Sequence, residues 1–180
     1  MALPIRVVVH GAAGKMGREV LNALCRTPDL KAVGAVDKAG SAGELALPDG
    51  AGTVPFSSDL AWVIARTKPD VMVDFSTAAS AMPAVRTSVE NGVRPVVGTT
   101  GLFQSDVQEI DKLCHAKRLG AVVAPNFSLG AVLLMHLAQI AGRYFDFAEI
   151  IELHHDQKAD APSGTALATA RMMAEARGKP

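Results

Sequence analysis

The sequence predicts an α/β protein whose helices cover both faces of a doubly wound, parallel sheet. Short apolar runs rich in Val and Ile recur along the chain, with segments of helical length between them. The runs are continuously apolar rather than alternating, which is typical of parallel strands buried on both faces. The expected strands are Ile5–His10, Lys31–Val36, Val71–Phe75, Arg94–Gly98 and Ala121–Ala124.

We expect helices between these strands over Lys15–Arg26, Ala78–Asn91 and Gln104–Lys117, because these segments have helical length and apolar spacing. Gly92 directly follows the second of them, at the position where glycine commonly ends a helix. The stretch 40–58 is rich in glycine and contains two prolines, so most of it is expected to be loop.

The pattern changes after residue 126. An apolar helix over Leu129–Tyr144, a strand over Ala148–Leu153, a polar loop and a helix over Gly164–Arg177 are expected there. We therefore divide the chain into a first domain, 1–128, and the beginning of an α+β domain, 129–180. The second part has about 50 residues and one strand, fewer than a free-standing domain normally needs, so we expect it to be truncated.

The composition excludes several classes of protein. Hydrophobic residues make up 49% of the chain, and 18 Lys and Arg balance 18 Asp and Glu, so no disordered chain and no basic nucleic-acid or membrane-surface module is expected. The uncharged stretch 119–142 is interrupted by Pro125, Asn126 and Ser128, which favours a buried helix over a membrane span. The two cysteines are too few for a disulfide framework and indicate the reducing cytoplasm.

A glycine-rich turn joins the first strand to the first helix. Glycines at this point allow a sharp turn and a close approach to a pyrophosphate, which the free N–H groups of the helix start can bind. The spacing matches two of the three glycines of the dinucleotide fingerprint, and a tight strand-to-helix turn explains it equally well by itself. The residues of the turn are Gly11, Ala12, Ala13, Gly14, Lys15, Met16 and Gly17.

A carboxylate at the end of the next strand adds to this pattern. Asp37 lies where the fingerprint places an acidic residue that binds the adenosine ribose. Together with the glycine turn, it predicts a Rossmann-type site for NADH or NADPH. Lys38 could bind the 2′-phosphate of NADPH or be a solvated loop charge, whereas Asp37 favours NADH, so weak discrimination between the two is expected.

Two small, hydroxylated runs follow later strands, at the edge where open α/β sheets bind ligands. Ser76 lies in the first run, 74–77, and Gly98, Thr99 and Thr100 lie in the second. Their hydroxyl and backbone groups can bind a carboxamide without crowding a flat nicotinamide ring. Either run could instead be an ordinary helix N-cap.

The richest run of chemical groups lies in the loop before the last helix. Two histidines and a lysine offer proton donors near neutral pH and cations for acidic groups. The helix start that follows can bind a carboxylate, although a polar loop and a well-capped helix give the same pattern. No metal site is predicted, because no third ligand is suitably spaced from the histidines. The residues are His154, His155, Lys158, Ser163, Gly164 and Thr165.

These runs give the sequence a family resemblance that covers nearly the whole chain. They lie, in order, at 11–17, 74–77, 98–101, 125–128 and 152–165. In this order they resemble the 4-hydroxy-tetrahydrodipicolinate reductase (dihydrodipicolinate reductase) family of bacterial diaminopimelate and lysine biosynthesis.

The resemblance implies an oxidoreductase that uses NADH or NADPH to reduce 4-hydroxy-tetrahydrodipicolinate, a small cyclic dicarboxylate, to tetrahydrodipicolinate. It implies His154 as the acid/base catalyst and Lys158 as the proton donor, with a homotetramer when the chain is full length. It implies substrate binding by His155, Ser163, Gly164 and Thr165. It implies dinucleotide contacts with the glycine turn and with Asp37, Lys38, Ser76, Gly98, Thr99, Thr100, Ala124, Pro125, Asn126 and Phe127.

Two other functions stay open at this point. Another NAD(P)-dependent dehydrogenase of a small acidic substrate, similar to homoserine or aspartate dehydrogenase, would share the dinucleotide half, but the run 154–165 is typical of the reductase. The second is a dinucleotide-binding fragment without catalysis, because members of the resembled family continue beyond Pro180.

Overall fold

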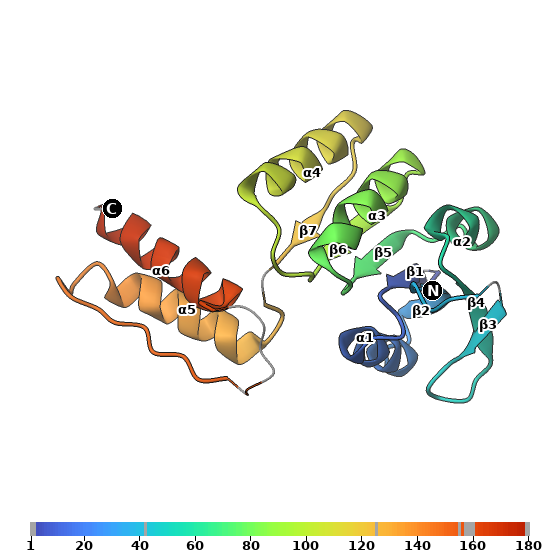
Figure 1. Cartoon of the computed structure of the whole chain (residues 1–180), viewed down its shortest axis with the longest axis horizontal. Coiled ribbons are helices and arrows are strands. Elements are labelled where there is room, and N and C mark those ends of the chain that lie inside the picture. The colour runs from blue at the N-terminus through green and yellow to red at the C-terminus, as the bar shows by residue number, and fades with distance from the viewer. Residues whose placement is uncertain (1–2, 42, 125, 155, 157–160, 179–180) are drawn as a thin grey trace. The chain divides into compact units, whose positions relative to one another are not determined.

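The computed structural model in Figure 1 describes residues 3–41, 43–124, 126–154, 156 and 161–178. The chain divides into two compact units, Met1–Val123 and Ala124–Pro180. The boundary that we predicted after residue 128 lies a few residues beyond this division, and it stays a prediction.

The first unit is built on a seven-stranded sheet with the order β3-β4-β2-β1-β5-β6-β7. Neighbouring strands run parallel except β3 and β4, which pair antiparallel at one edge. The predicted α/β fold is confirmed, but the sheet is mixed rather than wholly parallel. The strands are β1 (Ile5–His10), β2 (Leu30–Val36), β3 (Gly43–Ala46), β4 (Thr53–Ser57), β5 (Val71–Asp74), β6 (Arg94–Val97) and β7 (Val122–Val123).

Helices cover both faces of this sheet, as the doubly wound prediction requires (Figure 1). Successive residues of β1 point to opposite faces, so Val7 and Val9 pack in the core beneath α1, whereas Val8 packs in the core beneath α2, α3 and α4. This burial on both sides explains the continuously apolar strands of the sequence. The helices are α1 (Lys15–Arg26), α2 (Leu60–Thr67), α3 (Ala78–Glu90) and α4 (Gln104–Lys117).

The stretch 40–58, which we expected to be mostly loop, contains the hairpin of β3 and β4, so that expectation was wrong. Leu45, Val54 and Phe56 pack into the core beneath α1, which gives these short strands an apolar face despite the nearby glycines and prolines. Between them, the Asp49 carboxylate accepts the Ala51 N–H at 3.0 Å and stabilises the turn.

Helix α2 is a further element that the sequence analysis did not predict. The Asp59 carboxylate accepts the Trp62 N–H at 3.1 Å and caps the helix start. Leu60, Val63 and Ile64 bury its inner face. Its eight residues are too few for a clear helical period, so the cap was the only strong signal.

The second unit contains two helices that pack against each other, α5 (Leu129–Ala141) and α6 (Gly164–Arg177). Helix α5 ends three residues before the predicted end at Tyr144. The predicted strand over 148–153 was wrong, because these residues have no regular secondary structure. A strand is stable only beside another strand or against a packed layer, and Ile151 and Leu153 are 83% and 92% exposed.

No helix in the described part of the chain combines the length and the apolar character needed to cross a membrane. This holds for α5, which is mostly apolar but contains His136 and Gln139 and has only 13 residues.

Candidate functional site

The glycine turn lies at the carboxyl end of β1, directly before α1. Gly11 has a φ of +80°, which glycine adopts without strain, and its N–H donates to the Val36 carbonyl at 2.8 Å. A Cβ on Gly17 would collide with the Gly11 carbonyl and lie 2.7 Å from the Ala12 Cα, so the helix starts in direct contact with the turn. The N-cap, Gly14, has no capping side chain, and the first turn holds no acidic residue. The free N–H groups at this helix start therefore fit a phosphate.

Asp37 directly follows β2, and its side chain contacts the glycine turn. One carboxylate oxygen accepts the Ala13 N–H at 3.1 Å, and the other accepts the Ala39 N–H at 3.2 Å. These bonds hold the carboxylate beside the turn, while Lys38 is exposed. An acidic group fixed next to a helix start that could bind a phosphate fits the adenosine ribose and pyrophosphate of a dinucleotide.

A buried carboxylate joins the ends of three neighbouring strands. Asp74 is 0% exposed at the end of β5, and its Oδ1 lies 2.6 Å from His10 Nδ1 at the end of β1. The Ser76 hydroxyl donates to Oδ1 at 2.6 Å, and the Thr99 hydroxyl donates to Oδ2 at 2.6 Å. Thr99 Oγ1 also accepts the Ser76 N–H at 2.8 Å. We call these four residues, His10, Asp74, Ser76 and Thr99, the Asp74 cluster.

The alternative explanation of these runs, a helix N-cap, holds for Thr77 in the first run but not for the cluster hydroxyls of Ser76 and Thr99. Thr77 is the N-cap of α3 and Phe103 is the N-cap of α4. Gly98 is in close contact with the Phe75 ring, because a Cβ there would overlap that ring. The structure therefore brings Ser76, Gly98 and Thr99 together at one point of the sheet edge, with the exposed Thr100 beside them.

The cluster sets the ionisation of Asp74. Burial raises the pKa of this carboxyl, but the hydrogen bonds from His10, Ser76 and Thr99 and the charge of His10 outweigh burial, and the pKa lies below its ordinary value. Asp74 is thus a carboxylate at neutral pH, and its stabilising effect is lost as the pH falls.

We expect the Asp74→Asn variant to unfold at a lower temperature than the wild type at pH 7, because the amide cannot accept from all three donors. The carboxylate stabilises the fold fully above its unfolded-state pKa of about 3.9 and progressively less as the pH falls towards its lower native pKa. The difference in melting temperature should therefore shrink below about pH 4. Thermal unfolding of both proteins followed by circular dichroism from pH 7 to pH 3 measures this difference. A difference that stays constant over this range would contradict the assignment of Asp74 as a stabilising carboxylate.

In the second unit, Asn126 connects two of the predicted runs. Its side-chain amide donates to Thr165 Oγ1 at 3.1 Å, and its Oδ1 accepts the Ser128 N–H at 2.7 Å. A residue predicted to contact the dinucleotide is thus bonded to one predicted to bind substrate. Ala124 and Phe127 lie on either side of this connection, and Pro125 lies outside the described residues.

Glu152 is bonded to the start of α6 and lies near His154. Glu152 Oε1 accepts the Ser163 N–H at 2.7 Å, and its Oε2 lies 3.8 Å from His154 Nδ1. The Ser163 hydroxyl accepts the Ala166 N–H at 3.0 Å, so this side chain caps the helix, and Gly164 and Thr165 form the first turn. His155 and Lys158 lie outside the described residues.

No role was predicted for three residues that organise these sites, His10, Asp74 and Glu152, although the last two lie in the runs 74–77 and 152–165. Their partners lie up to 64 residues away along the chain, which a spacing argument does not reach. A carboxylate at the end of a buried strand was the one available signal for Asp74.

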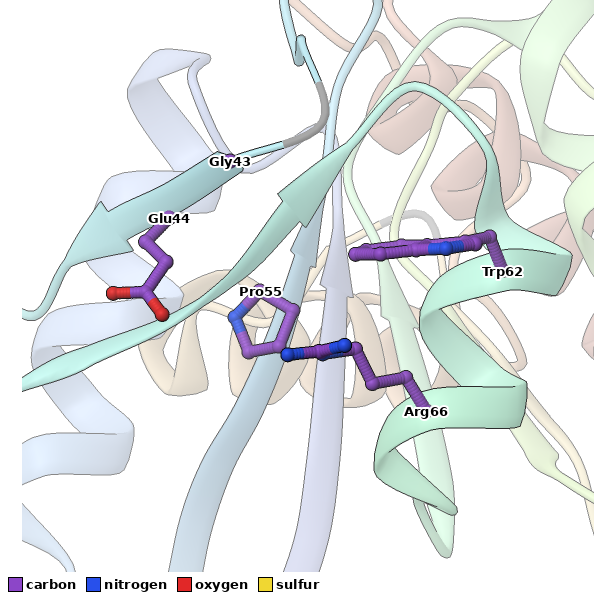
Figure 2. A pocket seen from close by; sticks show the side chains of 5 residues that line it. All are labelled: Gly43, Glu44, Pro55, Trp62 and Arg66. Atoms are coloured by element: carbon purple, nitrogen blue, oxygen red, sulfur yellow. The ribbon is translucent and has the colours of Figure 1, made fainter.

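Two of the pockets formed by the described residues lie in the first unit. One, of about 220 Å³, lies at the β3 edge and is lined by Gly43, Glu44, Pro55, Trp62 and Arg66 (Figure 2). Arg66 lies over the Trp62 ring, 5.5 Å from its centroid. The other, of about 390 Å³, reaches the glycine turn through Ala12 and Ala13. The described residues contain no group of three or more His, Cys, Asp or Glu that could hold a metal.

The glycine turn, the fixed Asp37 and the strand order define an α/β protein of the nucleotide-binding Rossmann class. Solved structures support this class at the level of fold. For example, the WlbA dehydrogenase from Chromobacterium violaceum matches 80% of this chain, at 16% identity and a TM-score of 0.61.

Within that class, the chain belongs to the dihydrodipicolinate reductase family. Residues 5–127 match the model of that family's N-terminus, and residues 130–180 match the model of its C-terminus. This confirms the predicted family and, with it, 4-hydroxy-tetrahydrodipicolinate reduction in lysine biosynthesis over the other dehydrogenases considered.

Curated relatives match nearly the whole chain. A 4-hydroxy-tetrahydrodipicolinate reductase of Dehalococcoides mccartyi is 53% identical over 176 residues, which cover 98% of this chain and 67% of the relative. The corresponding reductase of Moorella thermoacetica is 54% identical and covers 100% of this chain and 68% of the relative. The chain therefore spans about two thirds of the length of these relatives.

A solved structure of the same family matches both units of the chain. The dipicolinate-bound dihydrodipicolinate reductase from Paenisporosarcina sp. TG-14 is 40% identical, with a TM-score of 0.80, and the match covers 97% of this chain and 67% of that one.

Proposed function

We propose that the first unit binds NADH or NADPH and that the second unit binds the cyclic dicarboxylate and supplies the proton for its reduction. The observation that carries this proposal is the Asp37 carboxylate bonded to the glycine turn at the open start of α1. When bound, the reduced nicotinamide supplies a hydride. The chain's own residues would bind and orient the dinucleotide and the substrate, and they would protonate the substrate.

The adenosine half of the dinucleotide would be held by main-chain and carboxylate groups. The N–H groups at the start of α1 would bind the pyrophosphate, and Asp37 would bind the ribose hydroxyls. Ser76, Gly98, Thr99 and Thr100 would contact the nicotinamide end.

The substrate's carboxylates would be bound at the start of α6. Gly164 and Thr165 are in its first turn, where free N–H groups favour an anion, and His155 would add a cation or a hydrogen bond. The related Paenisporosarcina reductase binds dipicolinate, which supports a planar dicarboxylate as the ligand here. Lys158 would donate a proton to the reduced carbon, and His154 would act as the acid/base group.

One titration series tests this proposal. NADH and NADPH fluorescence would be measured with the protein, and nicotinamide oxidation would then be followed by absorbance with the substrate precursor generated in situ. Binding together with oxidation supports the proposal. Binding without turnover in the full-length protein would contradict the enzymatic role and favour dinucleotide binding without catalysis. A cytoplasmic location and a homotetramer stay predictions, and gel filtration of the full-length protein tests the second.

We expect Lys38→Ala to weaken NADPH binding by about fivefold and to change NADH binding by less than about twofold. An exposed charge-assisted contact to a 2′-phosphate contributes about 1 kcal/mol, and NADH lacks that phosphate. Fluorescence titration gives both dissociation constants. Lys31→Ala, at the other end of β2, is the matched control. Equal effects on both dinucleotides would exclude the phosphate contact.

A further inference from the structure

Asp74 determines which way the two neighbouring hydroxyls can form hydrogen bonds. A carboxylate has no proton to give, so the hydroxyls of Ser76 and Thr99 must donate to it across their 2.6 Å contacts. Each hydroxyl has a single proton. The Ser76 hydroxyl also lies 3.4 Å from the Thr77 carbonyl, but the 2.6 Å contact to Asp74 takes its proton. Towards a ligand, both oxygens can therefore act only as acceptors.

The same carboxylate also fixes the ring of His10. Its Nδ1 lies 2.6 Å from Asp74 Oδ1 and must be the donor in this bond. His10 directly precedes Gly11, so one buried side chain connects the glycine turn with the loops after β5 and β6. The Gly98 N–H, which donates to the Asp74 carbonyl at 2.9 Å, adds a main-chain bond to the same connection.

We propose that Asp74 is a positioning residue for the nicotinamide end of the dinucleotide, because it turns the Ser76 and Thr99 oxygens into acceptors for the carboxamide NH₂ group. This inference rests on the proposed function, in which these loops contact the nicotinamide. If the carboxamide were turned so that its carbonyl oxygen took the place of the NH₂ group, that oxygen would face the lone pairs of the Ser76 and Thr99 oxygens and be repelled. The carboxamide would thus bind in one orientation.

A fixed carboxamide has a stereochemical consequence. Rotation of the nicotinamide by half a turn about its bond to ribose exchanges the two faces of the ring and moves the carboxamide to the opposite side. A site that accepts only the NH₂ group at the Asp74 cluster would therefore hold one face of the ring towards the substrate. Asp74 would act in this way without touching the dinucleotide.

The alternative is that Asp74 only stabilises the carboxyl ends of β1, β5 and β6. The burial of a carboxylate is costly, and an apolar side chain at the end of β5 would avoid that cost. If the role is purely structural, replacing Asp74 should weaken the binding of all parts of the dinucleotide alike. If Asp74 is a positioning residue, the replacement should weaken the binding only of ligands that carry the carboxamide.

The test compares three ligands by titration: NADH, ADP-ribose, which lacks the nicotinamide, and reduced 3-acetylpyridine adenine dinucleotide, in which a methyl group replaces the NH₂. We expect the wild type to bind NADH about tenfold more tightly than the acetylpyridine analogue, the effect of about one hydrogen bond. Asp74→Asn should weaken NADH binding by about tenfold and change the affinity for ADP-ribose by less than about twofold. It should also remove the preference for NADH over the analogue.

Two further variants make the test independent of the folding of Asp74→Asn. Ser76→Ala keeps Asp74 but removes one acceptor, and it should reduce the preference for NADH over the analogue. Asp70→Asn is the matched control. Asp70 directly precedes β5, whereas Asp74 ends it, so its contact with the Arg6 N–H lies at the amino end of the strand, away from the cluster. This variant should leave all three affinities unchanged.

The outcomes separate this inference from the function on which it rests. A wild type that binds ADP-ribose and NADH but does not distinguish NADH from the analogue would overturn the inference alone. Equal weakening of ADP-ribose and NADH by Asp74→Asn would also overturn it in favour of a structural role. A wild type that binds none of the three ligands would overturn the proposed function together with the inference.

Discussion

Replacing His154 or Lys158 by alanine is expected to lower turnover by about 10²–10⁴-fold, because each removes a group proposed to transfer a proton. Both residues belong to the run that precedes α6, whereas the glycine turn and Asp37 belong to the first unit. The dissociation constant for NADH should therefore change by less than about twofold. Steady-state oxidation of NADH gives the turnover, and fluorescence titration gives the affinity.

Two substitutions on α4 serve as controls for the removal of a histidine and a lysine. His115→Ala and Lys112→Ala change exposed side chains that belong to none of the predicted runs and should keep wild-type turnover. If both His154→Ala and Lys158→Ala turn over normally, the two catalytic assignments are wrong. If they lose turnover and NADH affinity in parallel, the residues bind rather than catalyse.

The Gly17→Ala variant is expected to lose about 2–3 kcal/mol or more of unfolding free energy and to lose dinucleotide binding. The new Cβ would collide with the Gly11 carbonyl and lie 2.7 Å from the Ala12 Cα, and both are main-chain groups that a side-chain rotation cannot relieve. Helix α1 would have to move away from the turn, and its N–H groups would no longer face a bound phosphate.

Urea unfolding and NADH titration measure the two effects of Gly17→Ala. Gly120→Ala is the matched control in the same unit, because a Cβ at Gly120 would meet no atom within 4 Å. An unchanged urea midpoint for Gly17→Ala would contradict the close contact between helix and turn.

The parallel core of the sheet could be predicted from sequence because each strand carries its own signal. The predicted strands Lys31–Val36 and Arg94–Gly98 are mostly apolar, and the structure places the end of each of the five predicted strands within one residue of the predicted position. The hairpin of β3 and β4 gave no such signal, because its apolar residues are few and lie among Gly and Pro. The segment 148–153 gave the opposite error: its pattern favours a strand, but strand formation depends on a neighbouring strand.

The site could be predicted in its parts but not in its connections. Glycines, hydroxyls and Asp37 were identified because each follows a strand at a known spacing. The bond from Asp74 to His10, by contrast, depends on β1 and β5 being adjacent in the sheet, which the order of strands along the chain does not state. The bond from the Ser163 N–H to Glu152 joins two residues of one predicted run, but it depends on how the loop between them folds, so the sequence did not predict it.

The stacked pair of Trp62 and Arg66 also provides a built-in spectroscopic probe. The sequence contains one tryptophan, and it lies on α2 in the first unit, 39% exposed. Tryptophan emission therefore reports the unfolding of that unit alone, whereas circular dichroism reports the helices of both units. Urea titrations followed by both signals would reveal whether α5 and α6 unfold at the same denaturant concentration as the sheet. Divergent midpoints would mean that each unit unfolds as a separate cooperative transition.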